Sequence, residues 1–121
     1  MSYDDNNIFA KILRGEIPCK KIYEDEFVLS FLDINPQKKV RALVIPKGKF
    51  VNLDDFTSKA TSEEIVGLMK GISTVAKKIG ISCIDNGGLR TLSIVGENGG
   101  QEVPPLHFHL FGGEKVGRMV Q

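Results

Sequence analysis

The sequence has few of the residues that cross-link a chain or bind metals. It holds two cysteines and two histidines among 121 residues, and it has no tryptophan. Cys19 and Cys83 lie far apart, which favours free thiols in a reducing compartment over a disulfide scaffold. No apolar run approaches the roughly 20 residues that a membrane-spanning helix needs, so we expect no membrane partner.

The chain also lacks a charge excess of either sign. Sixteen basic residues against fifteen acidic ones leave a net charge of +1, which argues against a general nucleic-acid binder that works by neutralising phosphates. The first seven residues are polar and acidic, unlike a signal peptide, and we expect a cytoplasmic protein. Length and composition predict one globular domain over residues 1–121.

Both histidines lie in one short apolar stretch, residues 105–113. The stretch is bounded by Pro-Pro and Gly-Gly and is rich in aromatic residues, which predicts a β-strand. Alternation along a strand places Leu106, Phe108 and Leu110 on one face. His107 and His109 then share the other face, about 7 Å apart.

Four explanations of the histidine pair are open at this point. The residues could share a strand by accident, ligate a metal, be buried in the core, or carry imidazole chemistry. A zinc site needs three or four ligands, and there is no third histidine and no C-x-x-C, so we predict no metal and no other cofactor. Core burial is disfavoured most, because the pair lies opposite the aliphatic stripe. A neutral imidazole has a bare nitrogen that can attack phosphorus or take a proton.

The rest of the chain predicts alternating helices and strands. A helix over residues 7–13, capped by Asp5 or Asn6, ends at Gly15. A long amphipathic helix begins at Thr61, whose spacing to Glu64 is that of a capping box, and ends at Gly80. Within it, the spacing of two glycines could let a neighbouring element approach closely; these are Gly67 and Gly71. The predicted strands cover residues 21–23, 27–33, 40–45, 89–95 and 103–111.

Two further stretches could contact a phosphate. Residues 96–101 contain Asn98-Gly99, a hairpin signal, and their glycines leave backbone N–H groups accessible. They are not a P-loop, because the Gly-Lys-Ser/Thr end is missing. Most of the basic residues between positions 38 and 49 are typical of a solvent-exposed face, but Arg41 lies inside a predicted strand.

Several ordered blocks carry a resemblance that covers nearly the whole chain. The sequence resembles the histidine triad (HIT) family, and within it the Hint-like nucleoside phosphoramidate hydrolases. The resemblance implies an α+β fold with a five-stranded antiparallel sheet and two main helices, and a homodimer with a continuous ten-stranded sheet. The blocks are residues 8–12, 15–18, 23–25, 31–37, 43–47, 99–103 and 106–113.

The resemblance also implies a reaction and the residues that perform it. Members of the family release a nucleoside monophosphate through a nucleotidyl-histidine intermediate. His107 is then the nucleophile, His109 contacts the phosphate and helps the leaving group, and Asp33 holds the ribose of a purine nucleotide of the AMP or GMP type. The residues that match the wall around the base are Phe9, Ile12, Ile17, Phe31, Ile34 and Leu43, and those beside the phosphate are Gly100, Gln101 and Glu102.

Three positions depart from the family pattern. The first histidine of its H-x-H-x-H motif is Pro105, a supporting histidine on the third strand is Arg41, and an asparagine is Ile94. Pro105 keeps its carbonyl, so the bond that fixes the nucleophile's tautomer could survive. Arg41 could support the phosphate, or it could lower the basicity of His107. Two outcomes stay open: a hydrolase with reduced turnover, or a nucleotide-binding or interaction module that has lost catalysis.

Overall fold

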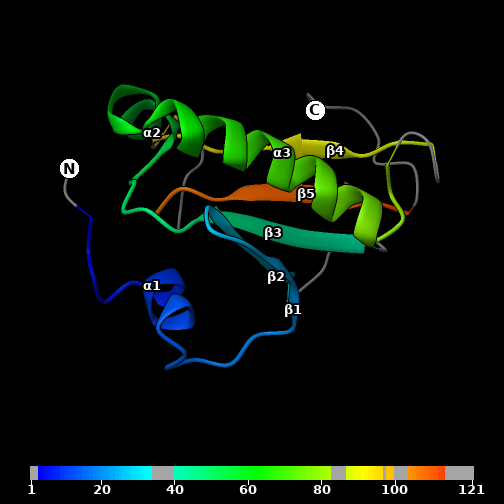
Figure 1. The fold of residues 1–121 in the computed structure, drawn as a ribbon, viewed down its shortest axis with the longest axis horizontal. Coiled ribbons are helices and arrows are strands. Elements are labelled where there is room, and N and C mark those ends of the chain that lie inside the picture. Colours follow the sequence, from blue (N-terminus) through cyan, green and yellow to red (C-terminus); the bar gives the residue numbers. More distant parts are fainter. Residues whose placement is uncertain (1–2, 34–39, 83–86, 97, 100–103, 114–121) are drawn as a thin grey trace.

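Five antiparallel strands form one sheet in a computed structural model that describes residues 3–33, 40–82, 87–96, 98–99 and 104–113. The strand order is β1-β2-β3-β5-β4, and every neighbouring pair is antiparallel (Figure 1). The α+β fold with a five-stranded sheet is thereby confirmed. In chain order the elements are α1 (Ile8–Leu13), β1 (Lys21–Glu24), β2 (Val28–Leu32), β3 (Val40–Pro46), α2 (Leu53–Lys59), α3 (Ser62–Lys78), β4 (Arg90–Leu92) and β5 (Phe108–Gly112).

Helix α3 covers one face of the sheet (Figure 1). It begins at the predicted capping box, in which the Thr61 and Glu64 side chains each accept a hydrogen bond from the other residue's backbone N–H. The larger hydrophobic core lies between this helix and the sheet. Its buried members are Val28, Ala42, Val44, Phe50, Phe56, Leu68, Ile72, Val75, Ala76, Ile81, Leu106, Phe108 and Leu110.

The close approach that two glycines predicted is present in α3. A Cβ added to Gly67 would lie 2.4 Å from the Phe27 ring, and one added to Gly71 would lie 2.8 Å from a methyl group of Val28. Both distances are too short for a real side chain. The helix therefore packs on the β1–β2 hairpin at a separation that only glycine allows.

A second, smaller core lies on the opposite face of the sheet, beneath α1. Strands β2 and β3 supply both cores because successive side chains point to opposite faces: Val44 belongs to the first core, and Leu43 belongs to the second. The buried members of the second core are Phe9, Leu29, Phe31, Leu43 and Ile45.

Several predicted boundaries were wrong. Helix α1 is capped by Asn7, whose side chain accepts a hydrogen bond from Ala10 N at 2.8 Å, and neither Asp5 nor Asn6 is the cap. Strand β4 covers only Arg90–Leu92, not residues 89–95. Pro46 is the last residue of β3 instead of following it.

The last strand also begins later than predicted, at Phe108, although residues 104–107 are described. Pro104 and Pro105 have no N–H to donate to a sheet ladder, and Leu106 N donates to Phe50 O at 3.1 Å instead. Asn98-Gly99 is therefore not the turn of a tight hairpin, since the ladder pair that lies nearest to it is Leu92 with His109.

Helix α2 was not predicted. Its N-cap is Asn52, whose side chain accepts from Asp55 N, and Asp55 in return accepts from Val51 N, both at 2.9 Å. The helix has seven residues and buries only Phe56, so it shows little apolar periodicity. In the described part of the chain, no helix has both the length and the apolar character needed to cross a membrane.

Candidate functional site

His107 is held at the entrance of β5 by the backbone that precedes it. Its Nδ1 lies 2.8 Å from the carbonyl oxygen of Pro105. A carbonyl can only accept a hydrogen bond, so Nδ1 carries the proton and donates it. The lone pair is then on Nε2. The backbone carbonyl of Pro105, which proline keeps although it lacks an N–H, thus fixes the tautomer of the His107 ring.

His109 lies on the same face of the sheet as His107, as the strand alternation predicted. The two ring centroids are 4.7 Å apart, and the rings meet edge to face. Burial was the least favoured explanation of the pair, but His109 is only 9% exposed. The reason is that the histidine face is itself covered: the ring stacks on Phe111 at 5.8 Å, and Leu43 is its partner on β3.

Arg41 reaches this site from β3. Its guanidinium has three neighbours: Nε lies 2.8 Å from Asp33 Oδ2, Nη2 lies 3.4 Å from His109 Nδ1, and Cζ lies 5.0 Å from the centre of the Phe111 ring. The contact of Nε with the carboxylate is an ion pair by distance but not a well-directed hydrogen bond. The charged group of Arg41, which the sequence marked as unusual within a strand, therefore lies against His109 and not against His107.

Burial shifts both imidazoles towards their neutral forms. It is the main reason that the pKa of His107 lies below its usual range, while the hydrogen bond to Pro105 opposes the shift and the charge of Arg41 adds to it. For His109, burial, the neighbouring His107 and Arg41 lower the pKa to about 4, against a smaller opposing effect of Asp33. Both rings are therefore neutral at pH 7, as a nucleophile and a neutral hydrogen-bond donor require.

Three of the residues predicted to surround a base belong to the smaller core. Phe9, Phe31 and Leu43 are buried, and the Phe9 ring lies 5.0 Å from the His107 ring and 6.0 Å from the Phe31 ring. Ile12 and Ile17 line a hollow of about 380 Å³ beside α1. Phe9 is thus the predicted wall residue whose ring contacts His107 directly. The predictions for Ile34, Gly100, Gln101 and Glu102 lie outside the described residues.

Phe111 is a site residue that the sequence reasoning missed. It stacks on His109 and also lies under the guanidinium of Arg41, its partner across the β3–β5 ladder. The available signal was its position two residues after His109, which places it on the histidine face. The sequence pattern alone assigns Phe111 to the apolar stretch of residues 105–113 and gives it no role at the site.

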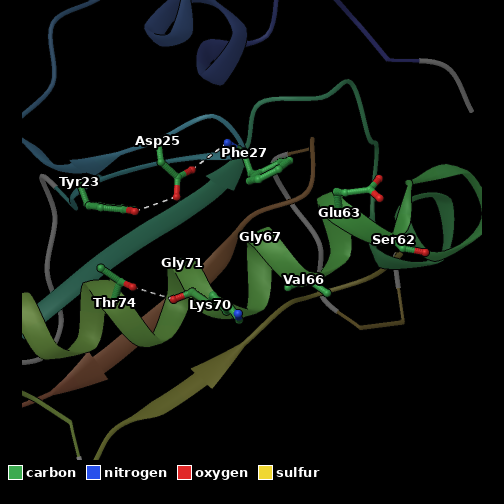
Figure 2. Close-up of a pocket in the computed structure, with 10 residues that line it drawn as sticks. All are labelled: Tyr23, Asp25, Phe27, Ser62, Glu63, Val66, Gly67, Lys70, Gly71 and Thr74. Atoms are coloured by element: carbon green, nitrogen blue, oxygen red, sulfur yellow. Dashed lines mark hydrogen bonds between the residues drawn. The ribbon is translucent and has the colours of Figure 1, made fainter.

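A larger hollow, of about 600 Å³, lies away from the histidines. It is bounded by the β1–β2 hairpin and by α3 (Figure 2). The Tyr23 hydroxyl donates to Asp25 at 2.8 Å on the hairpin side, and Val66 and Lys70 line the helix side. Neither histidine lines it, so its size alone does not make it the reaction site.

Comparisons with known proteins match nearly the whole chain. A sequence model described as the HIT domain matches residues 14–116. An uncharacterized 13.2 kDa HIT-like protein of Azospirillum brasilense is 51% identical over 119 residues, which are 98% of this chain and 95% of that protein. A solved HIT family hydrolase from Legionella pneumophila Philadelphia 1 superimposes with a TM-score of 0.82 at 35% identity, covering 93% of this chain and 96% of its own. A histidine triad protein from Clostridium difficile gives 0.81 at 37%, covering 95% and 96%.

Proposed function

The chain belongs to the HIT family and has the fold of HIT family hydrolases, and from this premise we propose that it releases a purine nucleoside monophosphate from phosphoramidate-type substrates. The nucleophile is Nε2 of His107. The observation that carries the proposal is the 2.8 Å contact between His107 Nδ1 and Pro105 O, because it leaves the lone pair on the other nitrogen. The proposal assigns the protein to the Hint-like branch of the family.

The first step is an attack of His107 Nε2 on phosphorus. The bond to the leaving group breaks, and its electron pair stays on the leaving atom, which takes its proton from water. The ring becomes a positively charged nucleotidyl-imidazole that still donates its Nδ1 proton to the carbonyl oxygen of Pro105. In the second step, water attacks phosphorus and the electron pair of the P–N bond returns to Nε2. The nucleoside monophosphate leaves, and one proton passes to the solvent.

The surroundings of His107 support a nucleotide of the AMP or GMP type. Phe9, whose ring contacts His107 edge-on, offers an apolar wall for a base at the site, and Phe31 and Leu43 continue that wall. Asp33 is proposed to bind the ribose hydroxyls, and for this its ion pair with Arg41 must make room for them or share the carboxylate with them. We further propose that two copies of the chain pair as a homodimer.

A second candidate function is a nucleotide-binding module without turnover. The observation that favours it is the Arg41–Asp33 ion pair, whose two side chains are each 15% exposed. Because the pair occupies the carboxylate that would hold the ribose, it could orient a nucleotide away from the productive position. Binding would then persist while hydrolysis would be absent.

The two candidates differ in one assay. Purified protein is incubated with the adenosine 5′-phosphoramidate of a nitro-substituted arylamine, and AMP release is followed by chromatography for the native chain, His107→Ala and Lys70→Ala. We expect release by the native chain and by Lys70→Ala, a control on the exposed side of α3, and none above background by His107→Ala. AMP binding without release by the native chain would reject the hydrolase in favour of the binding module.

A further inference from the structure

Arg41 is fixed by contacts on three sides. Asp33 neutralises its charge at 2.8 Å, the Phe111 ring lies beneath its guanidinium at 5.0 Å, and its backbone is held in β3, where Arg41 O accepts from Asp33 N at 3.2 Å. A guanidinium that is packed and paired in this way does not swing freely into solvent. Its Nη2 is aimed at the histidines and lies 3.4 Å from His109 Nδ1.

This contact determines where the proton of His109 lies. A guanidinium has five donors and no acceptor, so the Nδ1 of His109 must be the acceptor. The single proton of the neutral ring is then on Nε2. Burial, His107 and Arg41 lower the pKa of His109 to about 4, and Asp33, the other charged group that faces the ring among the described residues, opposes them. At pH 7 the ring can donate a hydrogen bond but has no second proton.

A neutral imidazole is a poor proton donor to a leaving group. Giving up its Nε2 proton would leave an imidazolate beside His107, whereas an imidazolium gives up a proton and remains a neutral ring. A neutral histidine can still polarise an oxygen by hydrogen bonding, as one does in triosephosphate isomerase. His109 is therefore suited to holding a phosphate oxygen and unsuited to protonating a strongly basic amine.

We propose that Arg41 is a specificity-determining positioning residue that restricts efficient turnover to substrates whose leaving group departs without a proton from His109. The inference rests on the proposed attack by His107. As the new P–N bond forms, the electron pair of the breaking bond goes to the leaving atom. A carboxylate, a phosphate or an electron-poor arylamide can keep that pair and take a proton later from water. An alkylamine cannot depart without a proton, because the alkylamide anion that it would form is far too basic.

The need for a proton from His109 divides the substrates into two groups that differ in their rate of turnover. Mixed anhydrides of nucleoside monophosphates with carboxylic or phosphoric acids, and phosphoramidates of weakly basic arylamines, are turned over efficiently. Phosphoramidates of alkylamines bind in the same place and react slowly. The permanent charge of Arg41 also favours the turnover of the first group, because a positive charge attracts a leaving group that departs as an anion.

The test is a series of adenosine 5′-phosphoramidates that runs from an alkylamine to a nitro-substituted arylamine, with the 4-nitrophenyl ester of AMP as an added substrate. We measure kcat/KM for the native chain, Arg41→His and Arg41→Met and plot its logarithm against the pKa of the leaving group. The native chain is expected to give a steep negative slope. In Arg41→His the slope flattens, and the rate for the alkylamine relative to the ester rises by about 10-fold or more, since proton donation contributes roughly 10²–10⁴-fold where it operates.

A second readout does not depend on activity. Two-dimensional ¹⁵N NMR of the imidazoles distinguishes the tautomers, and it is expected to place the proton of His109 on Nε2 in the native chain and to lose that preference in Arg41→Met. Thermal unfolding of each variant shows whether it folds. If the unpaired carboxylate of Asp33 prevents Arg41→Met from folding, the double variant Arg41→Met/Asp33→Asn is measured in its place.

The outcomes separate the two proposals. Turnover of the series with equal slopes for the native chain and the variants would overturn the role of Arg41 while leaving the nucleophile His107 intact. An Nδ1–H tautomer of His109 in the native chain would also overturn it. Absence of turnover for every substrate in the series would reject the proposed hydrolase and the inference built on it.

Discussion

The two faces of the sheet are covered in different ways, although the same strands supply both. On one face, the 17-residue helix α3 and the sheet together form a core of thirteen buried residues in the described part of the chain, and two glycines bring the helix close to the β1–β2 hairpin. On the other face, the six-residue helix α1 contributes one residue to a core of five buried residues in the described part of the chain. Strand β5 and the residue before it present two imidazoles and an aromatic ring beside that core. The first face therefore contributes most of the stability, and the second keeps polar groups within reach of a ligand.

The largest expected effect is on the histidine face. His107→Ala should reduce turnover by roughly 10³-fold or more, because losing the nucleophile of a covalent mechanism removes the step itself. The same change should leave the free energy of unfolding nearly unchanged, since the ring is partly exposed and makes one hydrogen bond to the backbone. Steady-state kinetics and urea unfolding measure the two quantities. A large loss of stability in His107→Ala would remove the distinction between the faces.

The matching change on the other face is Leu68→Ala. Leu68 is fully buried on the side of α3 that packs against the sheet, so its truncation should lower the free energy of unfolding by about 2–5 kcal/mol. Below the unfolding transition, kcat per folded molecule should be that of the native chain. A loss of kcat without unfolding would show that the core under α3 shapes the site on the far side of the sheet.

The close contact of α3 is tested by Gly67→Ala. Alanine favours a helix by about 1 kcal/mol over glycine, but here its Cβ would meet the Phe27 ring at 2.4 Å, near the root of that side chain. Overpacking of this kind costs about 1–3 kcal/mol, so we expect a net loss of stability. Ser73→Ala, at an exposed position of the same helix, is the matched control. If Gly67→Ala instead stabilises the protein, the β1–β2 hairpin can shift away from α3 at little cost in free energy.

The last expected effect is a dependence of stability on pH. The folded protein binds a proton at His109 only near pH 4, whereas an unfolded histidine binds one near pH 6.5. Stability from this residue is therefore fully present above about pH 6.5 and is lost as the pH falls towards 4. His107 acts in the same direction.

Urea midpoints between pH 7.5 and 4.5 measure this dependence. Replacement of the imidazole in His109→Asn should make the decline of the midpoint shallower. An identical decline in that variant would place the pH dependence in other groups, such as Asp25. Burial raises the pKa of Asp25, but hydrogen bonds from Phe27 N, Tyr23 Oη and Val28 N together outweigh burial and hold the pKa below its usual value.

Local signals in the sequence predicted the parts of the fold that depend on local chemistry. The capping box at Thr61 and the apolar periodicity after it fix α3, and strand alternation placed His107 and His109 on one face. Helix α2 was missed because its apolar pattern is too short. Its Asn52 and Asp55 have the spacing of a capping box, with aspartate where glutamate is usual, and they were the signal available.

Contacts between distant segments were harder to predict. Arg41 and His109 are 68 positions apart, and their contact depends on the register between β3 and β5. The sequence identified Arg41 as unusual for a strand, but not that Asp33 and Phe111 would hold it against the second histidine. The late start of β5 likewise depends on Leu106 bonding to Phe50, a contact that lies outside any local pattern.

The most direct test of the covalent mechanism is to trap its intermediate. The native chain is mixed rapidly with an adenosine 5′-phosphoramidate of a weakly basic arylamine and denatured at alkaline pH, and its peptides are examined by mass spectrometry. The mechanism predicts an adenylyl group on His107 within the first turnover. Release of AMP with no adenylylated peptide, or with the adenylyl group on His109, would contradict it.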